Sequence, residues 1–428
     1  MDRKQLELYL VTDRGLSLGR DLEWVVEQAV KGGVTIVQLR EKDCSTAEFV
    51  ELGLRLKKIL APYGVPLLIN DRIDVALAVD ADGVHIGQSD MPYAIARKLL
   101  GPDKIIGLSA ETMDQVREAN MIPDVDYVAI SPVYATPTKT DTFVPFGLEG
   151  TAHAVALSVH PTCAIGGLNK TTIPDVAATG VDSIAVVSAI CSTPDPCSAA
   201  RELRTLIGES RKNTEYASWT EEAWKTSEQI YADICAHPFI TELSAGTLAT
   251  EKFVRYIAQD EIYLKNYGAE MFMLADMLPE GAMKDMFTEF ARSGMEMEAA
   301  MHQLLIDRFN IDLHVEASQA TLTYNGHTRA CIESGVLEVA LASMLPCMWI
   351  YNEVGRFIYD HRNLEANPYS EWIETYASEE FTAGVNEVLD MCNDLAAKAS
   401  PELRAAMTEA FRKSAFFEYA FWDFGYNG

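Results

Sequence analysis

Apolar residues in the first half of the chain fall into short runs separated by segments of helical period. The runs are rich in β-branched residues and apolar throughout, which is typical of strands buried on both faces of a sheet. Amphipathic segments between them, such as Thr46–Leu60 and Met113–Asn120, predict helices. Eight evenly spaced units favour a closed (β/α)8 TIM barrel over the competing doubly wound open sheet. Strands are expected at Leu8–Thr12, Thr35–Leu39, Pro66–Asn70, Gly83–Gly87, Ile105–Ser109, Tyr127–Ser131, Thr162–Gly166 and Ser183–Val187.

The pattern changes at Ser218, after which strand signals nearly vanish and long helical periods take over. Helix starts are marked at Ser218 with Glu221 three residues on, at Asn367-Pro368 and at Ser400-Pro401. The polar stretch Gly208–Ser218 is the expected linker. The chain has 428 residues, whereas single cores usually stop growing at about 250–300. We therefore expect a multidomain protein, with an α/β barrel at residues 1–210 and an all-α domain at residues 217–428.

Amino-acid composition limits the kinds of partner that the protein can bind and the compartments in which it can be located. A formal net charge of −28 disfavours nucleic acid, because the chain would repel the phosphate backbone. The eight cysteines are scattered without a C-x-x-C pair, which favours free thiols in a reducing compartment. The N-terminus lacks a signal-peptide core, and the apolar stretch Val336–Ile358 is interrupted by polar residues and Pro346. We expect a cytoplasmic protein with no membrane segment.

Polar residues cluster where the barrel strands are expected to end, which is where barrel enzymes carry their chemistry. Arg40, Lys42 and Lys139 could converge on phosphate oxygens. Asp71 and Asp90 supply two carboxylates of the kind that hold Mg²⁺ together with substrate phosphates. Alone, each such residue would be a helix cap, a turn or a solvated charge. Their number at one end of the barrel favours a site for phosphorylated small molecules.

The barrel half resembles thiamine-phosphate synthase over residues 6–208. The resemblance is carried by LYLVTD, VQLREKD, LINDRIDVAL, ADGVHIGQSD, IIGLSAET, DYVAISPVYATPTKTD, AIGGLN and AVVSAI. It implies displacement of diphosphate from hydroxymethylpyrimidine diphosphate by the nitrogen of thiazole phosphate, with Mg²⁺ held by Asp71 and Asp90. By the same resemblance, the pyrimidine diphosphate is bound by Gln38, Leu39, Arg40, Glu41, Lys42, Asn70, Ser109 and Lys139, and the thiazole phosphate by Thr136, Pro137, Thr138, Gly167, Val187 and Ser188.

Three residues of the helical half fall on apolar stripes, where packing favours apolar side chains. Asp260 and Glu418 are carboxylates, which are almost never buried without a partner, and Cys347 follows Pro346 on a third stripe. Two inward carboxylates predict a polar pocket inside the bundle. The plainer interpretations are a core cysteine, a partner such as Arg255 or a tyrosine for Asp260, and a surface position for Glu418.

The helical half resembles the TenA-type thiaminase II, or aminopyrimidine aminohydrolase, family over residues 217–425. HPFITELSAGTL, FVRYIAQDEIYL, ASMLPCMWIYNEVG, WIETYAS and FFEYAFWDF carry the resemblance. It implies a haem-oxygenase-like bundle that releases hydroxymethylpyrimidine from an aminopyrimidine or thiamin. Cys347 would be the nucleophile, Glu418 the acid/base and Asp260 the ligand of the pyrimidine amino group and ring nitrogen. The pocket would be lined by Tyr263, Tyr324, Tyr376 and Phe421.

Together the two halves predict a bifunctional, homo-oligomeric enzyme of thiamin biosynthesis and salvage. Three rival hypotheses remain: a synthase whose helical half only binds a pyrimidine or supports oligomerisation, a different phosphate-binding barrel enzyme, and a non-enzymatic scaffold.

Overall fold

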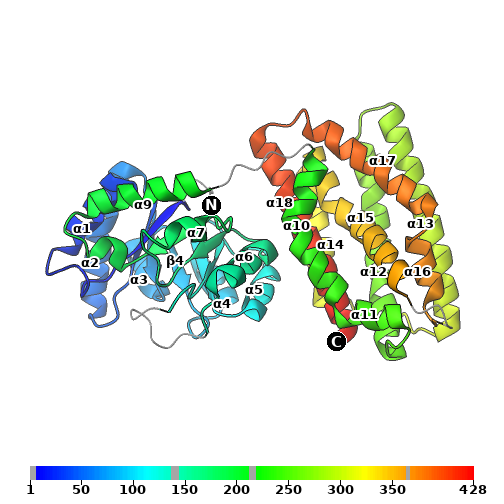
Figure 1. Ribbon diagram of the computed structural model, residues 1–428, viewed down its shortest axis with the longest axis horizontal. Helices are drawn as coiled ribbons and strands as arrows, with labels where there is room; N and C mark the ends of the chain where they lie inside the picture. The colour runs from blue at the N-terminus through cyan, green and yellow to red at the C-terminus, as the bar shows by residue number, and fades with distance from the viewer. Residues whose placement is uncertain (1–5, 136–143, 212–217, 363–366) are drawn as a thin grey trace. The chain divides into compact units, whose positions relative to one another are not determined.

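The computed structural model describes residues 6–135, 144–211, 218–362 and 367–428. The chain divides into two compact units, Met1–Thr214 and Glu215–Gly428, coloured blue to green and green to red in Figure 1.

The first unit is a closed barrel of eight parallel strands in sequence order, as predicted. Each predicted strand is present, with ends that differ by one or two residues. A residue of β1 such as Tyr9 pairs with Ile36 of β2 and Ala185 of β8, so the last strand closes on the first. The strands are β1 Leu8–Val11, β2 Ile36–Leu39, β3 Leu67–Asn70, β4 Gly83–Ile86, β5 Ile105–Ala110, β6 Tyr127–Ile130, β7 Thr162–Ala164 and β8 Ser183–Val186.

Helices cover the outside of the barrel, and α9 lies beside α1 where the barrel closes (Figure 1). The start of α2 is fixed by a capping box: Ser45 accepts from the Glu48 amide, and the Glu48 carboxylate accepts from the Ser45 amide. The helices are α1 Leu22–Gly32, α2 Thr46–Leu60, α3 Ile73–Val79, α4 Tyr93–Leu100, α5 Met113–Asn120, α6 Gly147–Leu157, α7 Ile173–Ala177, α8 Ser188–Cys191 and α9 Pro196–Ser210, with a 3-10 turn at Ala61–Tyr63.

The largely apolar barrel interior contains a hydrogen-bonded group around Tyr127. The ring of Tyr127 occupies space that the adjacent strand leaves open at Gly107. A Cβ atom at position 107 would lie 2.0 Å from the Tyr127 ring carbon that carries the hydroxyl. Gly107 therefore allows a buried phenol to stand inside the barrel, below its carboxyl-end mouth.

The regular secondary structure in the described residues of the second unit is all helical, which confirms the predicted all-α class. The long helices α10, α12, α15 and α18 pack on one another, and α10 runs beside α18 (Figure 1). The helices are α10 Trp219–Ala236, α11 Pro238–Ala245, α12 Thr250–Met277, α13 Ala282–Phe309, α14 Gln319–Glu333, α15 Leu337–His361, α16 Ser370–Tyr376, α17 Glu379–Ala396 and α18 Pro401–Asn427.

Two of the three predicted helix starts are confirmed. Ser218 caps α10 and Ser400 caps α18, each through its side chain. The third, predicted at Asn367-Pro368, lies two residues before the observed start of α16 at Ser370. The Asn367 amide nitrogen instead donates to the carbonyl of Leu243, 2.9 Å away, and its oxygen accepts from the Tyr369 amide. Asn367 therefore attaches this segment to α11 before the helix begins.

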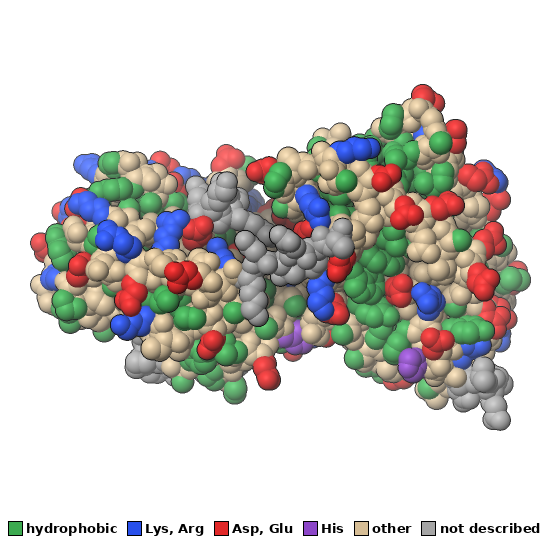
Figure 2. All heavy atoms as spheres, turned by 45° about the horizontal axis from the view of Figure 1, so that its top comes forward, with side chains coloured by type: hydrophobic (Ala, Val, Ile, Leu, Met, Phe, Trp, Pro, Cys, Tyr) green, Lys and Arg blue, Asp and Glu red, His purple; other side chains and the backbone are tan. Residues whose placement is uncertain are grey.

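Carboxylates are spread over the face shown in Figure 2, with basic side chains among them. Within the described part of the chain, no helix is long and apolar enough to cross a membrane.

Candidate functional site

The mouth of the barrel brings a lysine and two carboxylates together. Lys42 Nζ lies 2.6 Å from Asp71 Oδ2, and the carboxyl groups of Asp71 and Asp90 face each other within hydrogen-bonding range. Asp71 directly follows β3 with a φ of 61°, a left-handed conformation that Asp tolerates better than most residues. The Gly87 amide donates to Asp90 Oδ2 at 2.7 Å. Two strand ends are thus arranged to aim their carboxylates at one point.

The two neighbouring carboxyl groups have pKa values that shift in opposite directions. Burial would raise the pKa of Asp71, but the hydrogen bond and charge of Lys42 outweigh burial and lower it. Burial raises the pKa of Asp90, and the neighbouring Asp71 carboxylate raises it further. A cation between these groups would relieve the repulsion. The donor set therefore fits a divalent cation that takes one or two carboxylates and completes its shell with phosphate oxygens and water.

The other residues of the Gln38–Lys42 segment point in different directions. Arg40 faces Asp13, with Nη1 3.8 Å from the carboxylate Oδ2. Glu41 pairs with Arg14 at 3.2 Å, and its side chain is 7 % exposed. Leu39 is fully buried in the barrel wall. The Leu39 side chain is thus part of the wall, whereas Glu41 pairs through Oε2 and leaves Oε1 buried without a hydrogen-bond partner among the described residues.

Gln38 and Ser109 belong to one hydrogen-bonded group inside the barrel. Gln38 Nε2 donates to the Tyr9 hydroxyl at 2.7 Å, and the Tyr9 and Tyr127 hydroxyls are 2.9 Å apart. His85 joins Tyr127 to Ser109, with its ring nitrogens 2.8 Å and 2.9 Å from the two hydroxyls. Sequence reasoning missed Tyr9, His85 and Tyr127, although polar residues within otherwise apolar strands were the available signal.

The last two strands supply the expected small residues. Gly166 and Gly167 follow β7 with φ of 107° and 69°, and a Cβ on Gly167 would lie 2.8 Å from that of Tyr134. Val187 and Ser188 follow β8, with Val187 half-buried and the exposed Ser188 at the start of α8. The residues predicted in the preceding loop, Thr136, Pro137, Thr138 and Lys139, lie outside the described residues.

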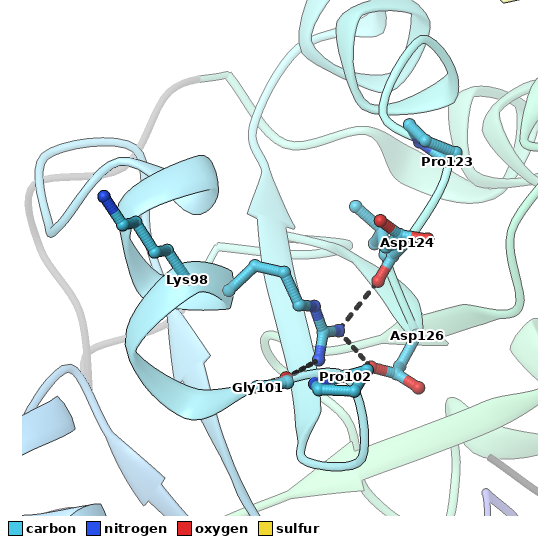
Figure 3. A pocket seen from close by; sticks show the side chains of 8 residues that line it. Lys98, Gly101, Pro102, Pro123, Asp124 and Asp126 are labelled. Carbon is cyan, nitrogen blue, oxygen red and sulfur yellow. Dashed lines mark hydrogen bonds and ion pairs between the residues drawn. The ribbon is translucent and has the colours of Figure 1, made fainter.

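A cavity of about 570 Å³ lies near the opposite, amino-terminal ends of the strands (Figure 3). The hydrogen bonds of its polar side chains stabilise the fold. Arg97 of α4 extends across it and donates to the carbonyls of Gly101 and Asp124 and to the Asp126 carboxylate. The guanidinium also bonds the Tyr93 hydroxyl. Since these bonds occupy the guanidinium, it joins the start of β5 to the turn before β6 rather than receiving an anion.

Arg97→Ala is expected to destabilise the barrel by about 1–3 kcal/mol, because several part-buried acceptors lose their donor together. Hydrogen exchange of barrel peptides measures this change. Lys98→Ala is the control, since Lys98 is exposed beside the same cavity, and we expect an effect within about 0.5 kcal/mol. Equal protection in Arg97→Ala and wild type would contradict the structural role.

The second unit encloses a thiol and a carboxyl group among aromatic rings. Cys347 of α15 is 7 % exposed and Glu418 of α18 is 1 % exposed, so the surface position considered for Glu418 is wrong. The Tyr324 hydroxyl donates to Glu418 Oε1 at 2.6 Å. The rings of Tyr263 and Tyr324 are tilted with centroids 4.8 Å apart, and Phe421 lies 5.8 Å from Tyr263. These residues come from α12, α14, α15 and α18, and all face one interior site.

Burial governs the protonation of this site. It raises the pKa of Glu418 to about 8, helped by Asp260 and Glu298 and opposed by the Tyr324 hydrogen bond. It also raises the pKa of the Cys347 thiol well above its usual range, and the charges of Glu418 and Glu298 add to that effect. At neutral pH the site therefore holds a neutral thiol beside a protonated carboxyl group. The Tyr263 hydroxyl lies beside the thiol and has no hydrogen bond of normal geometry among the described residues.

Asp260 is buried on α12, and its partner is a histidine. His302 of α13 places Nε2 3.2 Å from Asp260 Oδ2 and Nδ1 3.0 Å from Glu261 Oε2. Arg255, the partner weighed from the sequence, instead reaches the carbonyl of Gly425. Sequence reasoning missed His302, although it lies beside Met301 on the same apolar stripe as Leu305, the signal that revealed Asp260.

Tyr376 brings a third carboxyl group to the site. Its hydroxyl donates to Glu298 Oε1 at a long 3.4 Å, and its ring lies 5.0 Å from that of Tyr351. Burial raises the pKa of Glu298 to about 8. Sequence reasoning missed Glu298, although the residues three and four positions further along α13, Met301 and His302, are buried.

The geometry defines two classes of site in one chain: a barrel mouth built for phosphates, and a helical bundle enclosing a thiol, carboxyl groups and aromatic rings. Among the described residues, no cluster of three or more His, Cys, Asp or Glu side chains could hold a metal by itself. A cation at the barrel mouth would therefore depend on substrate oxygens.

Comparison with known proteins identifies both units. Residues 8–190 match the family model described as thiamine monophosphate synthase, and residues 224–428 match the TENA/THI-4/PQQC family. The thiamine-phosphate synthase of Albidiferax ferrireducens is 54% identical over 202 residues, which are 47% of this chain and 92% of that protein. The chain belongs to the thiamine-phosphate synthase family through its barrel and carries a TenA-type domain after it.

Solved structures cover each half separately. A thiamine phosphate pyrophosphorylase from Pyrococcus furiosus is 38% identical, covers 49% of this chain and 99% of its own, and has a TM-score of 0.46. A TenA homologue from the same organism is 24% identical, covers 49% of this chain and 100% of its own, and has a TM-score of 0.47.

Proposed function

We propose that this chain is a bifunctional enzyme of thiamin biosynthesis and salvage. Its barrel joins hydroxymethylpyrimidine diphosphate to thiazole phosphate, and its helical unit hydrolyses an aminopyrimidine or thiamin to hydroxymethylpyrimidine. The pair Asp71–Asp90 with Lys42 supports the first activity, and the Cys347 site with Glu418 supports the second. The rival of a purely binding or assembly domain is disfavoured, because a thiol and a proton-holding carboxyl group share one aromatic pocket.

In the barrel reaction, the thiazole nitrogen forms a bond to the pyrimidine methylene carbon while the bond to the diphosphate oxygen breaks. No side-chain nucleophile is needed. Asp71 and Asp90 would hold Mg²⁺, which supplies positive charge to the leaving diphosphate. Lys42 adds charge at the same point. Asn70 and Ser109, near the carboxyl ends of β3 and β5, would bind the pyrimidine diphosphate. The glycine pair after β7 and the small residue Ser188 leave backbone groups open to the thiazole phosphate.

In the helical site, the Cys347 sulfur would add to a carbon of the electron-poor pyrimidine ring while its proton passes to a ring nitrogen, and the sulfur takes that proton back when it leaves the ring after water has entered. Glu418, protonated at neutral pH, would donate a proton to the departing amine or thiazole and later take one from the incoming water. Tyr263, Tyr324 and Phe421 would hold the ring by stacking. The balanced outcome is one water consumed and one carbon–nitrogen bond broken.

The direct test is to assay the full chain for both activities. Thiamin phosphate is measured after adding pyrimidine diphosphate, thiazole phosphate and Mg²⁺. Hydroxymethylpyrimidine is measured separately after adding an aminomethylpyrimidine or thiamin. We expect both products. Folded protein that forms only thiamin phosphate would leave a synthase with a binding or assembly domain, and formation of neither product would reject the proposal.

The pH dependence of pyrimidine release tests the role of Glu418. Because its pKa is raised to about 8, the carboxyl group is protonated below that pH, and kcat should fall roughly tenfold per unit above it. Tyr324→Phe removes the hydrogen bond that lowers the pKa and should move this decline to higher pH. Glu418→Gln should lower kcat by about 10²–10⁴-fold. A profile unchanged from pH 7 to 10 would exclude Glu418 as the acid.

Cytoplasmic location and homo-oligomeric assembly remain predictions from the sequence. Light scattering that shows only a 47.3 kDa species would reject the assembly.

A further inference from the structure

His302 lies between two carboxylates in the interior of the helical unit. It is 1 % exposed and Asp260 is 2 % exposed. Each ring nitrogen faces a carboxylate oxygen, Nε2 toward Asp260 and Nδ1 toward Glu261. Glu261 reaches the surface side of the pair, where Lys265 Nζ lies 3.2 Å from its other oxygen.

This geometry requires a charged imidazole if both acids are ionised. A neutral imidazole donates from one nitrogen only, whereas an imidazolium donates from both. Asp260, Glu261 and Glu298 all favour the charged ring and overcome burial, so that the pKa of His302 is raised to about 9. The phenols around Asp260, those of Tyr256, Tyr351 and Tyr376, remain protonated because burial raises their pKa values well above the usual range.

The resemblance to TenA-type enzymes assigns Asp260 to the amino group and ring nitrogen of the substrate. The charge of Asp260 would then determine which form of an aminopyrimidine can pair with it. An amino group and the adjacent ring nitrogen present one donor and one acceptor when the ring is neutral. A protonated carboxyl group matches that pattern, since it donates to the ring nitrogen and accepts from the amino group. A carboxylate only accepts, so it matches the ring only when the ring nitrogen carries a proton.

We propose that His302 is a positioning residue that holds Asp260 as a carboxylate, so that the helical site takes its aminopyrimidine as the N-protonated cation. The inference rests on the proposed function of this unit. An N-protonated ring is more electrophilic than a neutral one, so the same ion pair that binds the ring prepares it for attack by Cys347. The positive charge of the ligand also enters a pocket that Asp260 has made negative, in keeping with electrostatic complementarity.

The test measures the protonation of a bound ligand. The probe is 4-amino-5-hydroxymethyl-2-methylpyrimidine labelled with ¹⁵N in the ring and bound to the full chain. Its ¹⁵N shifts are followed from pH 6 to 9.5, with the free compound as reference. We expect the bound ring to stay protonated at least one pH unit above the free compound. We also expect ¹⁵N-labelled His302 to give imidazolium signals at pH 8.

His302→Gln should bind the ring in its neutral form at pH 8 and weaken binding about tenfold or more at that pH. Glu261→Gln is the matched control, because its amide oxygen can still accept from Nδ1 and Asp260 keeps its partner, so the bound ring should remain protonated. Thiamin phosphate formation by the barrel should be unchanged in both variants. If His302→Gln does not fold, the wild-type measurement still tests the proposal, because a neutral bound ring or a neutral His302 would overturn it.

Binding of the neutral ring by wild type at pH 7.5, with His302 also neutral, would overturn this inference and leave the proposed hydrolase intact. Failure of folded wild type to bind the pyrimidine at all would overturn both. A protonated ring in wild type and in His302→Gln alike would show that His302 does not determine the charge.

Discussion

Asp71→Asn is expected to lower the synthase kcat by at least about 100-fold, since stabilising the charge on a leaving group supplies much of the rate enhancement in such reactions. The substitution keeps the size of the side chain but removes its charge. It also removes the anionic partner of Lys42, which lies 2.6 Å away, and leaves Asp90 as the sole carboxylate of the pair. Measurement of thiamin phosphate at increasing Mg²⁺ should show weaker activation as well as a lower maximum.

Asp74→Asn is the control for this experiment. Asp74 lies three residues further on, and its side chain is 61% exposed and paired with Arg72. We expect near wild-type synthase activity from it. Pyrimidine release by the helical unit should be normal in both variants, which shows that the chain is folded. Full synthase activity in Asp71→Asn would show that the reaction does not require the carboxylate pair.

Cys347→Ser is expected to reduce pyrimidine release by at least about 10³-fold, because a hydroxyl is a far weaker nucleophile than a thiol in the same position. The raised pKa of Cys347 means that the thiol must lose its proton as it attacks. A serine hydroxyl holds its proton more tightly still. Mass spectrometry of hydroxymethylpyrimidine, with an aminomethylpyrimidine and with thiamin as separate substrates, measures the loss and shows which substrate is preferred.

Cys392→Ser provides a matched control in the same unit. Cys392 of α17 is completely buried, and burial alone raises its pKa. The same atom exchange there should leave release unchanged apart from a modest loss of stability. If Cys347→Ser released hydroxymethylpyrimidine as fast as Cys392→Ser, the thiol at position 347 would be a packing residue.

The local pattern of apolar and polar residues along the chain was sufficient to predict the fold. Eight apolar runs became eight strands because buried parallel strands need continuous apolar sequence, and the capping serines began their helices where expected. The Asn367-Pro368 signal placed the helix start two residues too early: Asn367 Oδ1 accepts from the Tyr369 amide, while its amide nitrogen donates to the α11 carbonyls. Short-range rules do not include such partners.

The candidate sites were predictable residue by residue but not as groups. Strand ends indicated Asp71 and Asp90, and polar residues on apolar stripes indicated Asp260 and Glu418. The sequence could not show that Glu41 turns to Arg14, since that pairing joins two loops across the mouth. Nor could it show that His302 bridges Asp260 and Glu261, because the bridge crosses 42 positions of the chain and depends on how α12 packs against α13.

The contact between Gly107 and Tyr127 restricts which substitutions this barrel can accept during evolution. A methyl group at position 107 would overlap the Tyr127 ring, so a larger residue can enter there only after the phenol has shrunk or moved. Tyr127→Phe does not open the reverse order, since it keeps the ring carbons that lie 2.0 Å and 2.4 Å from a Cβ at position 107. A smaller side chain without a ring at position 127 has to come first. Mutational paths through this pair are therefore directional, and a lineage that loses the ring first gains freedom at the glycine that other lineages lack.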